Sequence, residues 1–259
     1  MTNSSRFVSD RRTNQNVSWS EELDWQAGER TNVEIVDGAL VSQMDPPESG
    51  VARWNFEQDL SDSWGTNHGS DYTSSGYTSA PTGGYAKIFN GSTDRVVVPN
   101  ASELQFTNSI TISTWSYLNG RDDENSRIIT KRTDGQTVES YGLVKDQFVD
   151  GDDSMAFRVY IDGEHATLDS PEPIPLRVWT HWIGTWDGTI QRLFKNGVEV
   201  GSQPLTGTIA TNPDALGIGC RGDGNNDWWN GYIDDLRLYS KGITASEASN
   251  LYTTGRISG

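Results

Sequence analysis

The sequence is poor in cysteine, histidine and long apolar runs. Cys220 is the only cysteine, which excludes an intrachain disulfide, and the three histidines, His68, His165 and His181, are too scattered to form a zinc site. No segment has the ~20 consecutive apolar residues of a membrane-spanning helix, and the first residues lack the apolar core of a signal peptide. We therefore expect no membrane insertion, and a protein that either stays in the cell or leaves it by another route, such as release in a virus particle.

Positive charge is scarce as well. The chain has 20 Lys and Arg residues against 36 Asp and Glu residues, which gives a net charge of −16. This charge repels nucleic acids and anionic membrane surfaces, so neither is expected as a partner. The only lysines are Lys87, Lys131, Lys145, Lys195 and Lys241. An acidic, lysine-poor surface is typical of halophilic organisms. The alternative is an ordinary acidic secreted protein. Loss of folding at low salt would favour a halophilic source.

Tryptophan and glycine are plentiful, with 10 and 27 copies, and the most informative segment covers residues 177–200. It predicts three strands joined by tight turns at Asp187-Gly188 and Asn196-Gly197, because Asn-Gly readily supplies the two positive φ angles of a type I′ hairpin. Trp182 and Trp186 fall on one face of the first strand, and Trp179, His181 and Ile183 fall on the other. Apolar groups on both faces predict a strand in the middle of a sandwich.

Further segments extend this pattern along the chain. They read AKIFNG (86–91), DRVVVP (94–99), SITISTW (109–115), LGIG (216–219), GYIDDLRLY (231–239) and ITASEASNLY (243–252). In this order they resemble the strands of the laminin-G-like, concanavalin A-like lectin and glucanase jelly rolls, from about residue 51 to residue 252. The resemblance implies an all-β fold, a two-sheet antiparallel jelly-roll sandwich. A capping box formed by Thr244 and Glu247 predicts a short C-terminal helix over residues 245–252.

Residues 1–50 lie outside the resemblance. We expect them to form an N-terminal arm, and residues 51–259 to form the jelly-roll domain. The arm contains a hairpin signal at Asp37-Gly38, and the turn-forming segment 45–50 separates it from the sandwich. Two interpretations stay open: a docking arm for other subunits, or an extra hairpin on the edge of the sandwich.

Calcium is the expected cofactor. The resemblance implies a structural Ca²⁺ held by an acidic residue of the first strand, a loop carbonyl and an aspartate of the last strand. The matching positions in this sequence are Glu57, Gly91 and Asp234. The alternative is that Asp234 and its neighbour Asp235 face solvent at a strand edge.

Counting loops along the sandwich predicts a second acidic cluster. If successive loops alternate between its two ends, residues 119–126, 145–154 and 187–189 share one end, and residues 221–230 lie at the other. Six carboxylates would then gather, either around a cation or as solvated turn residues. They are Asp122, Asp123, Glu124, Asp150, Asp152 and Asp153.

The loop that covers residues 221–230 is a candidate ligand-binding rim. Adjacent strand residues point to opposite sides, so one of Trp228 and Trp229 is expected in the core and the other in solvent. An exposed tryptophan beside Asn225, Asn226 and Asp227 would make a sugar-binding rim. The alternative is that both tryptophans pack under the loop.

No catalytic motif is complete. The related sandwich glycosidases carry two glutamates that flank an aspartate on one strand. The nearest match, Glu22-Leu-Asp24-Trp-Gln26, has a glutamine where the second acid is needed, and a glutamine cannot transfer the proton. We therefore expect that the protein is not an enzyme.

The expected function is surface recognition. We predict a module that binds a cell-surface glycan or glycoprotein, exposed on a virion as a turret, spike or tail-fibre subunit of a virus that infects a halophilic host. The protein would then be extracellular on the virion surface and homo-oligomeric, with residues 1–50 bound to other virion subunits. Two alternatives stay open: a purely structural decoration or assembly protein, and a divergent glycoside hydrolase.

Overall fold

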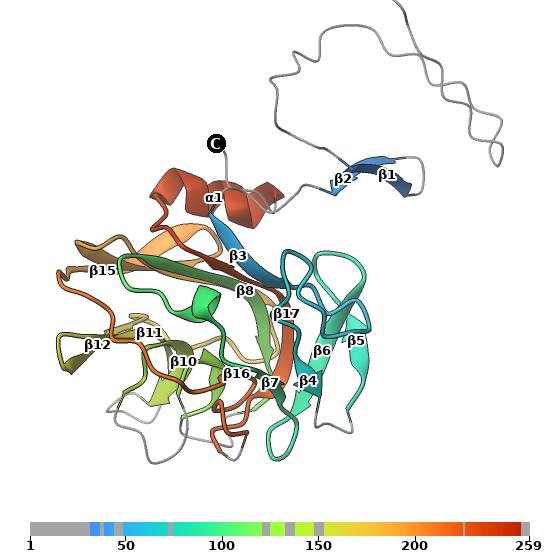
Figure 1. Ribbon diagram of the computed structural model, residues 1–259. Coiled ribbons are helices and arrows are strands. Elements are labelled where there is room, and N and C mark those ends of the chain that lie inside the picture. Colours follow the sequence, from blue (N-terminus) through green and yellow to red (C-terminus); the bar gives the residue numbers. More distant parts are fainter. Residues whose placement is uncertain are drawn as a thin grey trace, which may run out of the picture. The chain divides into compact units, whose positions relative to one another are not determined.

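The computed structural model (Figure 1) describes residues 32–36, 39–43, 49–71, 75–120, 125–132, 138–147, 153–224 and 226–254. The chain divides into two units, Met1–Asp45 and Pro46–Gly259. In the first unit, strands β1 (Asn32–Val36) and β2 (Ala39–Gln43) pair antiparallel, with Val36 opposite Ala39. The hairpin predicted around residues 37–38 is therefore present.

The second unit is a sandwich of two antiparallel sheets, as predicted (Figure 1). The strand order of the seven-stranded sheet is β12 (Glu164–Asp169), β11 (Asp153–Ile161), β10 (Tyr141–Gln147), β9 (Arg127–Thr130), β16 (Leu216–Ile218), β7 (Val96–Val98) and β4 (Ser70–Asp71). The strand order of the eight-stranded sheet is β15 (Val198–Pro204), β14 (Ile190–Lys195), β13 (Thr180–Trp186), β8 (Ile110–Leu118), β17 (Asn230–Tyr239), β6 (Tyr85–Asn90) and β5 (Tyr77–Ser79), with β3 (Gly50–Trp54) also paired to β17. A 3₁₀ turn, η1 (Ser102–Leu104), joins β7 to β8.

The main core lies between the two sheets. Trp182 and Trp186 of β13 are fully buried there, together with Phe157 and Val159 of β11. Every residue of β13 is buried, as expected for a strand with neighbours on both sides and side chains packed on both faces. The prediction that this segment is central to the sandwich is confirmed.

A second, smaller core lies on the outer face of the eight-stranded sheet. Ile183 and Phe194 of this sheet pack with Ala248 and Leu251 of helix α1 (Ala245–Thr254). The helix begins where the capping box predicted it: the Thr244 N–H donates to Glu247 Oε2 at 2.8 Å, and the Glu247 N–H donates to Thr244 Oγ1 at 3.3 Å. It ends two residues later than predicted.

The tight turns follow from local sequence. Asn196 and Gly197 have φ angles of 51° and 77°, which are the two left-handed conformations that a type I′ hairpin needs between β14 and β15. The Asn196 side chain also accepts from the His181 N–H at 2.9 Å, so the turn is tied to the neighbouring strand.

The loop count was wrong beyond residue 162, because it missed strand β12. That strand is a short edge strand whose residues are all exposed or half-buried, and its apolar face consists of Ala166 and Leu168 alone, too few for a clear alternation. One extra strand reverses the end to which each later loop belongs. Trp186 is opposite Ile110, so the turn at residues 187–189 lies at the start of β8 and not beside residues 119–126. The loop at residues 221–230 does lie beside them, since the Asn119 N–H donates to the Asn230 carbonyl at 2.9 Å.

Candidate functional site

The acidic pair Glu57 and Asp234 lies where two strands share one edge of β17. Strand β6 pairs with residues 230–233 of β17, and β3 pairs with residues 236–239. A β-bulge at Asp235, with a φ of 47°, separates the two pairings. Glu57 follows β3, and its Oε1 faces the Tyr85 N–H at the start of β6, at 3.5 Å. The gap between the two pairings therefore brings Glu57 and Asp234 close together.

Asp234 is buried and only partly satisfied. Its Oδ2 accepts from Thr82 Oγ1 at 2.6 Å, whereas its Oδ1 is buried with no hydrogen-bond partner. Burial raises the pKa of Asp234 to about 7, and the nearby Asp235 and Glu57 carboxylates add to the rise. Asp235 itself is an ion-pair partner, bonded to Arg53 and Arg237. Neither aspartate faces solvent, so the alternative of a solvated strand edge is wrong.

Gly91 does not join this pair. Its N–H donates to the Trp229 carbonyl, beyond the other end of β6, and Asp234 lies five residues further along the chain from Trp229. At ~3.3 Å per strand residue, this is roughly 16 Å away. Within the part of the chain that the structure describes, no three His, Cys, Asp or Glu side chains gather as a metal-binding group. An ion at Asp234 would therefore take its remaining ligands from Thr82, backbone carbonyls and water, which Ca²⁺ accepts.

The second predicted acidic cluster is largely outside the described residues. Asp122, Asp123, Glu124, Asp150 and Asp152 all lie there. Asp153 is described, and its Oδ1 is 3.0 Å from Lys145 Nζ, with both side chains buried. Asp153 therefore has a cationic partner within the sheet.

The predicted rim of the loop at residues 221–230 is split between core and surface. Trp229 is fully buried in the main core, Trp228 is half-buried and Asn226 is exposed, while Asn225 lies outside the described residues. Asp227 is buried: its Oδ2 lies 3.0 Å from Arg127 Nε and 2.6 Å from Arg221 Nε. Of this group, Trp228 and Asn226 are the described side chains that reach the surface.

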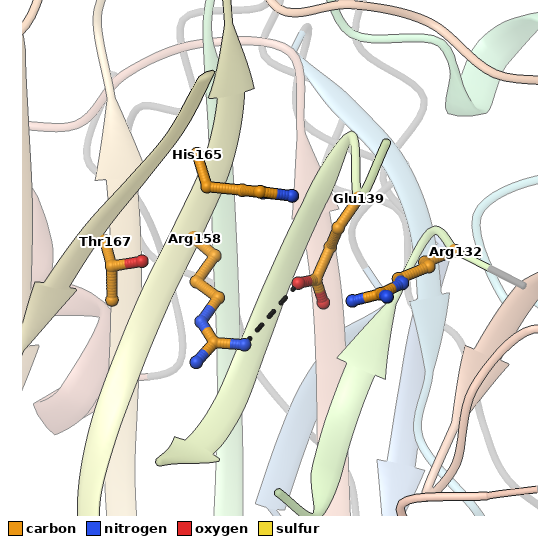
Figure 2. Close-up of a pocket in the computed structure, with 5 residues that line it drawn as sticks. All are labelled: Arg132, Glu139, Arg158, His165 and Thr167. Atoms are coloured by element: carbon orange, nitrogen blue, oxygen red, sulfur yellow. Dashed lines mark ion pairs between the residues drawn. The ribbon is translucent and has the colours of Figure 1, made fainter. Parts of the chain in front are cut away.

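A pocket that the sequence analysis did not predict lies on the outer face of the seven-stranded sheet (Figure 2). Arg158 alternates along β11 with Phe157 and Val159, which point into the core, so its own side chain points outward. Thr167 of β12 is directly opposite Arg158. The lining residues are Arg132, Glu139, Arg158, His165 and Thr167, around a volume of about 240 Å³.

Gly142 makes room for the central carboxylate of this pocket. Gly142 lies on β10 between Arg158 of β11 and Thr130 of β9. A Cβ placed on Gly142 would lie 2.9 Å from Glu139 Oε1, so a larger residue would push this side chain away. The carboxylate thus lies over bare backbone, with Arg158 and Arg132 pointing toward it from opposite sides (Figure 2).

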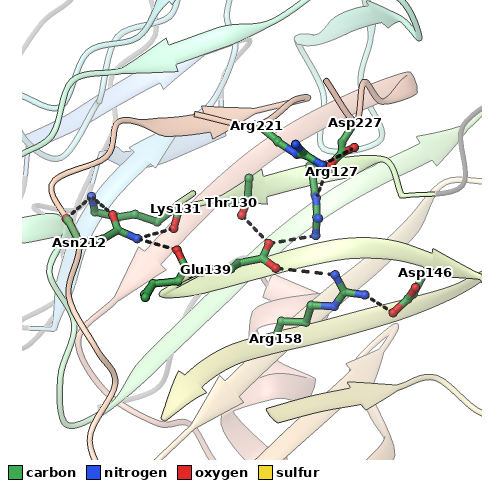
Figure 3. A network of polar contacts seen from close by, with 10 residues as sticks. Arg127, Thr130, Lys131, Glu139, Asp146, Arg158, Asn212, Arg221 and Asp227 are labelled. Atoms are coloured by element: carbon green, nitrogen blue, oxygen red, sulfur yellow. Dashed lines mark hydrogen bonds and ion pairs between the residues drawn. The ribbon is translucent and has the colours of Figure 1, made fainter. Parts of the chain in front are cut away.

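Glu139 belongs to a buried network of ion pairs (Figure 3). Its Oε1 accepts from Thr130 Oγ1 at 2.6 Å and from Arg127 Nη1 at 2.9 Å. Its Oε2 lies 3.7 Å from Arg158 Nη1, too far for a hydrogen bond, and has no hydrogen-bond partner although it is buried. Arg158 also pairs with Asp146. The network therefore fixes Oε1 of Glu139 by hydrogen bonds and leaves Oε2 without one.

These pocket residues come from two strands and two strand-flanking segments, at irregular sequence spacing. No periodic pattern joins them, so the sequence alone does not predict the pocket. One signal was present: Arg158 interrupts a strand whose neighbours are apolar, and a charge there marks the outward face.

Solved structures with the same fold include domain 4 of AbnA, a GH43 extracellular arabinanase from Geobacillus stearothermophilus, in complex with arabinotriose. It is 21% identical, with a TM-score of 0.63, over 79% of this chain and 98% of that domain. The binding domain of Paraclostridial mosquitocidal protein 1 is 15% identical, with a TM-score of 0.63, over 80% of this chain and 52% of that one. The binding domain of botulinum neurotoxin serotype G is 11% identical, with a TM-score of 0.58, over 78% of this chain and 50% of that one. This chain thus spans about half of either toxin domain.

No curated protein matches the chain. The sequence profile of one family does, over residues 90–249, which is more than half of the chain. Its description agrees with the resemblance seen in the strand motifs and with the two antiparallel sheets of the sandwich. The chain belongs to the concanavalin A-like lectin/glucanases superfamily.

Proposed function

We propose that this protein is a non-catalytic recognition module that binds a glycan or glycoprotein. The observation that carries the proposal is the outer-face pocket, where a carboxylate oxygen without a hydrogen-bond partner and two guanidinium groups converge. Carboxylates accept hydrogen bonds from sugar hydroxyls, and guanidinium groups donate to sugar oxygens. At about 240 Å³, the pocket is smaller than the ~300–1,000 Å³ of typical ligand sites, so it fits one sugar unit rather than a long chain.

The mouth of the pocket supports a sugar ligand. His165 is exposed there, and its ring lies 4.7 Å from the Tyr160 ring in an edge-to-face arrangement. Such a pair offers an apolar surface beside polar groups, as a sugar ring requires. The arabinanase domain of the same fold was solved with arabinotriose, which supports a saccharide as the class of ligand.

A non-catalytic role is supported by the one carboxylate among the described residues that line the pocket. Retaining glycosidases need two carboxyl groups ~5–5.5 Å apart, one as acid and one as nucleophile. Glu139 is the acidic residue among the described lining residues, and one of its oxygens is already bonded to Thr130 and Arg127.

A glycan array probed with the full chain tests this function. We expect binding to at least one glycan, weakened by His165→Ala at the pocket mouth and unchanged by Trp228→Ala on the loop. The reverse pattern would move the site to the loop. No binding to any glycan would overturn the proposal and favour a structural assembly protein, and release of sugar from a polysaccharide would favour a glycoside hydrolase.

We also propose that Ca²⁺ binds at Asp234 and Glu57. The support is the buried, unpartnered Asp234 Oδ1 beside a second carboxylate and the Thr82 hydroxyl. A divalent cation here would neutralise two close carboxylates and hold the end of β3 against the start of β6. Calorimetric titration of chelator-treated protein with CaCl₂ tests this, with Asp234→Asn as the variant that should not bind.

The wider setting is a further part of the proposal. We propose that the chain is an extracellular, virion-exposed, homo-oligomeric subunit whose residues 1–50 bind other subunits. The net charge of −16 and the scarcity of lysine support a halophilic host, and the division of the chain near residue 45 supports a separate arm. Among the described residues, no helix is both long and apolar enough to cross a membrane. Immunogold labelling of virus particles purified from the host would test this location.

A further inference from the structure

The outer-face pocket carries a surplus of positive charge. The buried network around it contains the guanidinium groups of Arg127, Arg158 and Arg221. Three carboxylates, those of Glu139, Asp146 and Asp227, balance them. Arg132 is a fourth guanidinium, and within the described residues it has no carboxylate within ion-pair distance. The net charge of the chain is −16, so this local excess of positive charge among the described residues has the opposite sign to the molecule as a whole.

Arg132 is held in place by its backbone rather than by its side chain. Its carbonyl accepts from the Gly222 N–H at 2.7 Å, which fixes the chain as it leaves β9. Its Nε is buried with no hydrogen-bond partner, and so is the Nε of Arg158. Buried donors without partners are rare in native proteins and usually meet a water, an ion or a ligand. The Arg132 side chain is therefore charged, and its Nε has no acceptor among the described residues.

Glu139 does not cancel this charge at the pocket. Its Oε1 is occupied by Arg127 and Thr130, so its negative charge is largely compensated from beneath the pocket. Glu139 lines the pocket, and its Oε2, 3.7 Å from Arg158 Nη1, is buried without a hydrogen-bond partner. A ligand that fits both groups must offer an anionic acceptor to Arg132 and a hydroxyl donor to Glu139.

We propose that this pocket selects an acidic sugar, with the oxyanion of a carboxylate or sulfate group bound by Arg132 and a neighbouring hydroxyl bound by Glu139 Oε2. This inference rests on the proposed glycan-binding function and narrows its ligand class. A planar guanidinium matches a carboxylate or sulfate through two parallel hydrogen bonds. Inorganic anions lack the hydroxyl donor that Glu139 would accept, so a simple phosphate fits only half of the pocket.

Matched glycan pairs test the inference by calorimetry on the full chain. The probes are sialyllactose against lactose, an oligogalacturonide against its carboxyl-reduced form, and a carrageenan oligosaccharide against its desulfated form. We expect the acidic member of at least one pair to bind about tenfold or more tightly than its neutral partner, since hydrogen bonds to charged groups are the strong ones. The pair that shows this difference identifies carboxylate or sulfate as the source of the charge.

Two arginine variants separate the pocket from general electrostatics. Arg132→Gln should reduce binding of the acidic member about tenfold and leave the neutral member unchanged, and Arg132→Lys should restore part of the loss. Arg177→Gln removes the same charge from an exposed arginine outside the pocket and should have little effect. Equal binding of acidic and neutral partners, or equal losses in both variants, would overturn the inference while glycan binding itself stands. Failure of all six probes and of the wider array would overturn the proposed function as well.

Discussion

Among single residues, His181 is an ionisable group buried where its charged form is unfavourable. Burial lowers the pKa of His181 to about 3, although the nearby Asp235 opposes the shift; Arg237 adds to it. Its Nε2 lies 2.9 Å from Ser113 Oγ, its Nδ1 is buried without a partner, and its ring packs against Trp115. The folded protein therefore holds this imidazole neutral at pH values where the unfolded chain binds a proton.

This burial predicts a loss of stability in mild acid. Between the unfolded pKa of ~6.5 and the folded value, the unfolded state binds more protons, so stability falls as the pH falls. From about pH 7 to about pH 5 the contribution of His181 is about 2 kcal/mol. Urea unfolding at several pH values should show this decrease, and His181→Gln should flatten it by that amount. An unchanged pH dependence in the variant would mean that His181 is protonated in the folded state.

Asp234 predicts a response to metal removal. Ionised Asp234 beside Glu57 is unfavourable without a cation, because both burial and the neighbouring carboxylates oppose its charge. Chelator should therefore lower the Tm near neutral pH, and excess CaCl₂ should restore it. At a hundredfold excess over Kd the free energy of unfolding should rise by about 3 kcal/mol. Asp234→Asn should make the Tm insensitive to both. A variant that still responds to CaCl₂ would place the ion elsewhere in the chain.

Among the elements, helix α1 depends on its first turn. Thr244 and Glu247 exchange hydrogen bonds, and Glu247 Oε1 also lies 2.6 Å from Lys241 Nζ. Thr244→Ala should therefore lower the free energy of unfolding by about 1 kcal/mol. Ser246→Ala, at an exposed position of the same turn, is the control and should be neutral or slightly stabilising. Equal effects in denaturant unfolding would show that the cap contributes little.

The elements also show what could be predicted from the sequence. The hairpins around residues 187 and 196 were predicted because Asp-Gly and Asn-Gly specify turns locally, and the capping box did the same for α1. Strand β12 was missed because its apolar face has just two residues, Ala166 and Leu168, and this single omission reversed the placement of every later loop. Sequence order can thus identify elements, while their spatial neighbours depend on each strand being counted.

The candidate sites also differ in how far the sequence predicts them. Glu57 and Asp234 were paired through motifs of the family, whereas Gly91 was misplaced because the motif does not show which half of β17 its neighbours occupy. The pocket around Glu139 was not predicted at all. Its residues meet only through the register of β9 to β12, which nothing in the spacing of Arg132, Arg158 and His165 reveals.

At the scale of the whole molecule, the sandwich should fold without the arm. The buried core residues that the structure describes begin at Ala52, and β3 is anchored just upstream by a hydrogen bond from the Ser240 N–H to the Ser49 carbonyl at 2.8 Å. A chain that begins at residue 46 should therefore keep the circular dichroism spectrum and nearly the Tm of the full protein. A chain that begins at residue 51 loses this anchor and should be measurably less stable. Unfolding of both truncations would show that the arm belongs to the core.

The charge of the whole molecule predicts that salt stabilises it. Lys87, Lys131 and Lys145 are three of only five lysines, and all three are fully buried, so the surface carries even less positive charge than the composition indicates. Unscreened carboxylates repel one another and destabilise the compact state.

Raising KCl from about 0.1 M to about 1 M shortens the screening length from ~10 Å to ~3 Å and should raise the Tm. Sucrose at matched osmolality is the control for exclusion effects, because it strengthens burial without screening charge. If sucrose reproduced the whole effect of KCl, charge repulsion would not limit this fold, and the acidic surface would lose its connection to a salt-rich environment.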